Sequence, residues 1–206
     1  LVLAAAMRNA GIWNPDLIDE CYVEKAAEIG IAVTPANLWM KLSALNQTWR
    51  QSPIHGDLHG ENIRVRNGQA ILIDLASVTK GPMTADLAAL ETWLAFELPD
   101  GTEATRFGDP TWQAEIERLY LPAAFRHPPG PCGPASKLRW MSTVVRQIRT
   151  MGIAAQSCAT EYQTAVAVQL LRRCRWSNGP AADRFRRGYG YRIAVALVED
   201  ASGDGR

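Results

Sequence analysis

The chain has 206 residues, of which 47% are hydrophobic and 21% are charged, and its formal net charge is +1. This composition is typical of a globular protein, and no apolar run approaches the roughly 20 residues that a membrane-spanning helix needs. The four cysteines are Cys21, Cys132, Cys158 and Cys174. None forms a C-x-x-C pair, so their spacing fits neither a zinc framework nor a disulfide scaffold. We therefore predict free thiols, a cytoplasmic location and no membrane association.

Two helices are predicted before the middle of the chain. The first runs from an Asn-Pro-Asp turn at residues 14–16 to Gly30, with apolar residues at helical spacing. The second begins at Thr34 and Pro35, because threonine is a favoured N-cap and proline a favoured first helical residue. We expect Pro53 to interrupt the helical pattern. The apolar stripe of the second helix is Leu38, Leu42, Leu45 and Trp49.

A polar loop and a β-hairpin follow. Residues 54–62 contain two glycines and show no helical period, so we expect a loop there. A hairpin is predicted over residues 63–73, because Asn67 and Gly68 form the strongest short hairpin signal and apolar residues flank them. Asp74 stands at the end of the returning strand.

After residue 82 the chain is predicted to be helical again. The first of these helices has an expected buried face made of Leu87, Leu90, Trp93, Leu94 and Phe96. The later elements are a helix from near Asp109 to Phe125, a Pro-rich loop at 127–134, and helices near 135–152, 159–175 and 181–199. We interpret residues 201–206 as a disordered tail.

Basic residues are concentrated between Lys137 and Arg192. This stretch contains 11 basic residues against two acidic ones and carries a charge of +9, whereas the remainder of the chain carries −8. Such an asymmetry can mark a surface for nucleic acid or another anionic partner. No nucleic-acid recognition pattern accompanies it, so we favour packing of the basic helices beside the acidic part of the same protein.

Residues His55–Asn62 carry the pattern that points to chemistry. Phosphoryl transfer needs an acceptor for the proton of the substrate hydroxyl and oxygen ligands that hold Mg²⁺ against the phosphates. The kinase pattern is H-R-D-L-x-x-x-N followed by D-F-G, and this segment reads H-G-D-L-H-G-E-N. His55, Asp57 and Asn62 match in type and spacing, as does Leu58. The hairpin then places Asp74 where the second aspartate is required.

This segment resembles the catalytic loop of the aminoglycoside phosphotransferase and choline kinase-like family, a branch of the protein-kinase-like superfamily. The resemblance covers about residues 54–95. It implies that Asp57 is the catalytic base and that His55 braces the loop. It also implies that Asn62 and Asp74 bind the cofactors, Mg²⁺ and ATP (or GTP), as metal ligands.

Two departures from protein kinases favour the small-molecule branch. Gly56 replaces the arginine that would contact a phosphorylated activation loop, and Leu75-Ala76 replaces the Phe-Gly of D-F-G. The segment between Asp74 and Asp86 leaves little room for an activation loop. Asp86 resembles the structural aspartate that opens the next helix in this family.

The resemblance also implies an N-terminal β-rich lobe with a lysine that contacts the phosphates. Only Lys25 and Lys41 precede the loop, both on predicted helices, and the chain begins with a leucine. We therefore expect a C-terminal lobe from a longer polypeptide over residues 1–200, with a catalytic core at 52–98 and a helical remainder at 109–199. The expected fold is mainly α with a short β-hairpin, and the isolated chain is expected to be inactive.

The predicted function is transfer of the γ-phosphoryl group of a nucleoside triphosphate to a hydroxyl of a small-molecule acceptor. An alternative is a non-catalytic kinase-like regulatory or docking module of a larger bacterial signalling or defence protein, with the basic helices as its docking face. A more remote alternative is a zinc hydrolase that uses His55, Asp57 and His59 as an H-x-D-x-H site. The acceptor and the oligomeric state are left open.

Overall fold

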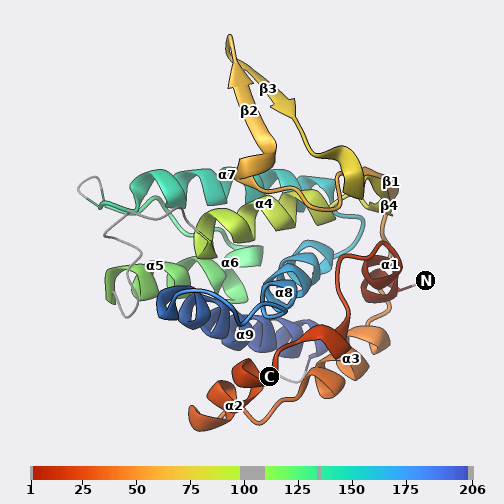
Figure 1. Ribbon diagram of the computed structural model, residues 1–206, viewed down its shortest axis with the longest axis vertical. Coiled ribbons are helices and arrows are strands. Elements are labelled where there is room, and N and C mark those ends of the chain that lie inside the picture. Colours follow the sequence, from red (N-terminus) through yellow and green to blue (C-terminus); the bar gives the residue numbers. More distant parts are fainter. Residues whose placement is uncertain (1, 98–109, 134–135, 204–206) are drawn as a thin grey trace.

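The computed structural model describes residues 2–97, 110–133 and 136–203 (Figure 1). Its helices are α1 (Leu3–Asn9), α2 (Glu20–Glu28), α3 (Pro35–Ala44), α4 (Ala85–Phe96), α5 (Pro110–Tyr120), α6 (Ala123–Arg126), α7 (Arg139–Ala155), α8 (Glu161–Arg173) and α9 (Ala181–Ser202). Its strands are β1 (Gln51–Ile54), β2 (Ile63–Arg66), β3 (Gln69–Leu72) and β4 (Thr79–Pro82). The predicted fold class, mainly α with a short β-hairpin, is confirmed. None of the described helices is both long and apolar enough to cross a membrane.

Helix α8 forms the centre of the molecule. Every residue from Glu161 to Leu171 is buried, and the helix packs against α9 along one side and α4 along another. The amide nitrogens of its buried glutamines have partners, because Gln163 donates to the carbonyl of Leu197 and Gln169 to that of Ala85. Polar side chains inside a core need such bonds. The helix therefore fixes α4 and α9 relative to each other (Figure 1).

Helix α4 buries a different face from the predicted one. Its buried residues are Ala85, Ala88, Ala89, Glu91, Thr92, Ala95 and Phe96, so only Phe96 of the expected face lies fully inside. The expected leucines and Trp93 are half-buried. The helix packs against both α7 and α8, and alanines allow close approach of the neighbouring helices on those sides. The leucine stripe covers the margin of the contact.

Helices α2 and α3 each begin directly after a capping residue. Thr34 accepts a hydrogen bond from the backbone of Asn37 at 3.2 Å, as expected for the N-cap of α3. The Asn-Pro-Asp turn begins only a short 3-10 helix at Pro15–Leu17, and α2 starts later, after Asp19. The side chain of Asp19 accepts from the backbone of Cys21 at 3.0 Å and so provides the cap.

The predicted hairpin is confirmed and projects from the helical body (Figure 1). Asn67 and Gly68 have φ angles of 51° and 74°, the left-handed pair that a two-residue hairpin turn needs. A second sheet was not predicted: β1 pairs antiparallel with β4, with Ile54 opposite Thr79. The chain therefore enters and leaves the segment of residues 55–78 at one place, beside the start of α4.

In the C-terminal half, the prediction of the last three helices is confirmed, and two predicted boundaries are wrong. The helix predicted up to Phe125 ends at Tyr120, because Pro122 separates α5 from the short α6. The predicted start at Asp109 and part of the Pro-rich loop lie outside the described residues. Helix α9 continues to Ser202, so the first two residues of the predicted tail are helical, and residues 204–206 lie outside the described range.

Candidate active site

The loop at residues 55–62 is held to the helical body by Asp86. The carboxylate of Asp86, in the first turn of α4, accepts hydrogen bonds from the backbone N–H groups of His55 at 2.6 Å and Gly56 at 3.1 Å. Bonds to a charged acceptor are stronger than neutral ones. Asp86 therefore occupies the structural position that the sequence resemblance implies.

His55 is buried and ties the loop to the end of the hairpin. Its Nε2 atom lies 2.8 Å from the carbonyl oxygen of Ile73, which can only accept, so Nε2 carries a proton. Its Nδ1 atom is buried without a partner among the described residues. This contact joins the start of the loop to the residue before Asp74.

Two glycines of the loop stand where no side chain fits. Gly56 has a φ of 79°, and a Cβ atom there would lie 2.5 Å from the carbonyl oxygen of Ser77. At Gly60 a Cβ atom would lie 2.3 Å from the ring of Trp93. The loop therefore lies directly against α4 and the segment after the hairpin, and its path depends on both glycines.

We expect Gly56→Ala to destabilise the fold more than Gly68→Ala does. Gly68 has a similar φ of 74° but open space around its Cα atom. Alanine there is therefore destabilising only through the strain of the left-handed conformation, about 1–2 kcal/mol. At Gly56 the clash with Ser77 adds roughly 1–3 kcal/mol, the usual effect of overpacking. Urea unfolding of both variants measures the difference. Equal losses of stability would contradict the close approach of Ser77.

Asp57 forms an ion pair that the sequence did not suggest. Arg172, near the end of α8, donates from Nη2 to Oδ1 of Asp57 at 2.8 Å and from Nη1 to the carbonyl of Gly56 at 2.9 Å. Burial lowers the pKa of Arg172, and the nearby Asp57 carboxylate works against this. No described residue hydrogen-bonds to Oδ2 of Asp57, to which His59 Nε2 comes no nearer than 3.9 Å. One carboxylate oxygen is therefore fixed and the other is available.

Asn62 pairs with the residue before Asp74 at the base of the hairpin. The side chain of Asn62 is buried and donates from Nδ2 to the backbone carbonyl of Asp57 at 3.0 Å. The backbone carbonyl of Asn62 accepts from the N–H of Ile73 at 3.0 Å. Asp74 follows Ile73 with φ 56° and ψ 60°, a left-handed conformation that is uncommon for residues other than glycine. Its carboxylate is exposed. The fold thus joins Asp57 to Asn62 directly, and sets Asp74 next to the strand partner of Asn62.

The zinc site considered as an alternative is not assembled. Within residues 2–97, 110–133 and 136–203, no group of three or more His, Cys, Asp or Glu side chains is arranged to hold a metal ion. His55 faces the carbonyl of Ile73, whereas the ring of His59 lies 6.2 Å from that of Trp93. The physical reason is Gly56, whose positive φ breaks the extended path that would align alternate residues on one face.

The basic C-terminal helices pair with acidic residues from elsewhere in the chain. Arginines of α7, α8 and α9 each contact a carboxylate that lies outside the basic stretch. The pairs are Arg149–Glu91 at 2.5 Å, Arg172–Asp57 at 2.8 Å, Arg187–Glu97 at 2.8 Å and Arg192–Glu117 at 2.5 Å. Part of the basic charge therefore serves internal packing, which is the interpretation that we preferred over nucleic-acid binding.

The comparison with protein families agrees with the loop geometry. A model described as "Phosphotransferase enzyme family" matches residues 15–128, more than half of the chain. No curated protein and no solved structure matches the chain. The matched segment contains the whole loop, the hairpin and Asp86, which are the parts that carry the resemblance seen in the sequence. The chain therefore belongs to the phosphotransferase enzyme family.

Proposed function

We propose that this chain carries the catalytic groups of a phosphotransferase that moves the γ-phosphoryl group of ATP (or GTP) to a hydroxyl of a small molecule. The observation that supports this most is the set of contacts that holds Asp57. Its Oδ1 atom is held by Arg172, its backbone carbonyl is held by Asn62, and no described residue hydrogen-bonds to Oδ2. A carboxylate that is fixed at one oxygen and open at the other suits a general base.

In the proposed reaction, Oδ2 of Asp57 takes the proton of the acceptor hydroxyl. The hydroxyl oxygen forms a bond to the γ-phosphorus, and the bond between that phosphorus and the β,γ-bridging oxygen breaks. The nucleoside diphosphate leaves with the electron pair of the broken bond. Asp86 contributes by holding the backbone of the loop, and His55 by fixing the loop to Ile73. Both are positioning residues, because neither reaches the reacting atoms through these contacts.

The side chains at the base of the hairpin fit Mg²⁺ in their chemistry. The amide nitrogen of Asn62 is committed to the carbonyl of Asp57, which leaves its amide oxygen for a ligand. The carboxylate of Asp74 is exposed, and no described residue forms an ion pair with it. Hard oxygens of these two types are what Mg²⁺ prefers. A bound Mg²⁺ would neutralise negative charge on the β- and γ-phosphates.

The proposal includes the remaining features that the family resemblance implies. An N-terminal lobe on the same polypeptide would cover the nucleotide, and the reaction would take place in the cytoplasm. Turnover should therefore be measured on the full-length natural protein. An absence of turnover would favour the alternative function, a non-catalytic docking module.

We expect the full-length protein to consume ATP or GTP only when Mg²⁺ is present. EDTA should abolish turnover and added Mg²⁺ should restore it. Asp74→Asn should raise the Mg²⁺ concentration for half-maximal turnover at least about tenfold, since loss of even an outer-shell partner costs roughly 10- to 100-fold in metal affinity. If the wild-type full-length protein shows no Mg²⁺-dependent nucleotide binding and no turnover, the enzyme proposal is refuted and the docking module is favoured.

A further inference from the structure

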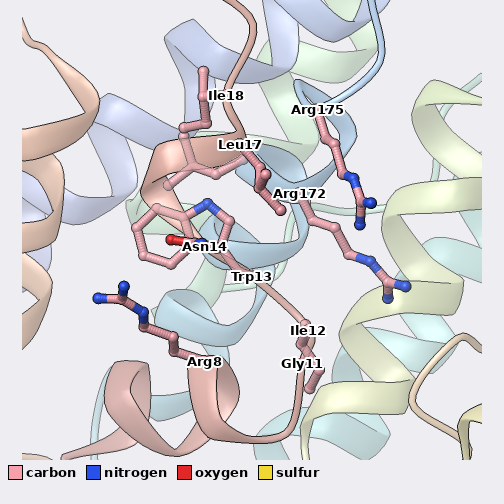
Figure 2. A pocket seen from close by; sticks show the side chains of 10 residues that line it. Arg8, Gly11, Ile12, Trp13, Asn14, Leu17, Ile18, Arg172 and Arg175 are labelled. Carbon is pink, nitrogen blue, oxygen red and sulfur yellow. The ribbon is translucent and has the colours of Figure 1, made fainter.

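A pocket of about 270 Å³ lies between the segment that follows α1 and the end of α8 (Figure 2). Three of its lining residues are arginines: Arg8, Arg172 and Arg175. No acidic residue is among the described residues that line it. In Figure 2, Arg172 and Arg175 lie on one side of the pocket, whereas Arg8 lies on the other side of Trp13 and Asn14.

One wall of this pocket contacts the catalytic carboxylate. Arg172 lines the pocket, and its Nη2 atom is 2.8 Å from Oδ1 of Asp57. A molecule in the pocket would therefore be separated from the proposed base by one guanidinium group. The family relationship leaves open where the acceptor binds, and this contact links the pocket to the reacting end of the loop.

The positive charge of the pocket is only partly compensated. Arg172 is paired with Asp57. Arg8 lies 5.0 Å from the ring centre of Trp39, and its ion pair with Asp16, at 3.6 Å and exposed, is of a kind that contributes little. Arg175 is exposed and lies 5.6 Å from the ring of Trp176, and no described carboxylate forms an ion pair with it. Burial lowers the pKa of Arg172, and the charge of Arg175 lowers it further. An anion placed here would offset this excess charge.

We propose that the pocket binds an oxyanion group, a phosphate or a carboxylate, of the same acceptor molecule whose hydroxyl is phosphorylated. This inference rests on the proposed function. Guanidinium groups present several donors in one plane and bind both oxyanions in a two-pronged way. A cationic acceptor would be repelled by Arg8 and Arg175. The volume lies just below the range of common small-molecule sites, so a compact acceptor fits best.

Binding of inorganic phosphate and of acetate to the full-length protein tests the pocket without any turnover. Titration calorimetry at low salt, in the absence of nucleotide, should show binding of both anions and none of tetramethylammonium. Arg175→Ala should weaken phosphate binding at least about tenfold, because it removes charge-assisted bonds. Arg139→Ala is the matched control, since Arg139 is an exposed arginine in the first turn of α7 that does not line the pocket. Its phosphate binding should equal that of the wild type.

Turnover with matched hydroxyl compounds then tests the acceptor. Glycerol 3-phosphate and glycerate should be phosphorylated faster than glycerol and choline, and Arg175→Glu should remove this preference. Turnover that prefers choline, or anion binding that Arg175→Ala leaves unchanged, would overturn the inference while the phosphotransferase proposal stands. Phosphate binding that depends on Arg175 in a protein without any turnover would instead defeat the proposed function and keep the anion pocket.

Discussion

Replacement of Asp57 by asparagine in the full-length protein should lower kcat by about two to four orders of magnitude, the usual contribution of a general base. Asparagine keeps the shape of the side chain and an oxygen that can accept from Arg172, but it cannot take a proton from the acceptor hydroxyl. Nucleotide binding should persist, because Asn62 bonds to the backbone carbonyl of residue 57 and not to its side chain. Steady-state kinetics and nucleotide titration of the same preparation separate the two effects.

Glu61→Gln is the matched control for this experiment. Glu61 lies in the same loop, its carboxylate is exposed, and it has no part in the proposed reaction. The control exchanges a carboxylate for an amide as Asp57→Asn does, so it should leave kcat close to that of the wild type. A similar loss in both variants would mean that the charge of the loop matters and not a base at position 57. Full activity of Asp57→Asn would exclude the proposed role of Asp57.

The parts of the fold that were predicted correctly are those that depend on neighbouring residues. Thr34 caps α3 through a residue three positions away, and the turn at Asn67 and Gly68 needs only its own backbone angles. The loop at 55–62 was predictable for the same reason, because its motif is contiguous. The base of the hairpin then follows, since antiparallel pairing sets Asn62 opposite Ile73, the residue before Asp74.

The parts that were missed depend on contacts between distant segments. Strands β1 and β4 are short and pair across the whole loop and hairpin, and Pro53 within β1 indicates a break when read alone. Arg172 lies 115 residues from Asp57, and nothing in its own helix distinguishes it from the adjacent Arg173. Its role follows from the packing of α8 beneath the loop, which local patterns do not encode.

The contacts of Glu91 in α4 were also not predictable from local sequence patterns. Its position on the helix gives no reason to expect burial of a carboxylate, yet it is fully buried and receives two partners. Arg149 of α7 donates to it at 2.5 Å, and the hydroxyl of Tyr162 donates at 2.8 Å. The guanidinium group of Arg149 also lies 4.0 Å from the ring centre of Phe125 and bonds to the carbonyl of Leu119. One buried ion pair thus joins α4 to α5, α6, α7 and α8.

We expect Arg149→Met to reduce the free energy of unfolding by about 3–5 kcal/mol, because it leaves the buried carboxylate of Glu91 without its counter-charge. Burial opposes the charge of Arg149, but Glu91 together with Tyr120 and Tyr162 outweighs this and raises the pKa of Arg149 above its ordinary value. Guanidinium chloride unfolding measures the loss, and Arg139→Met, at an exposed position of the same helix, should stay within about 0.5 kcal/mol of the wild type.

The double variant Arg149→Met with Glu91→Leu decides whether the pair or its single charges matter. Replacing both members of a buried ion pair by apolar residues is often neutral, so most of the lost stability should return. The return should stay incomplete by about 1–3 kcal/mol, because the buried hydroxyl of Tyr162 loses its acceptor. If the losses of the two single variants simply add in the double variant, Glu91 and Arg149 do not act as one unit.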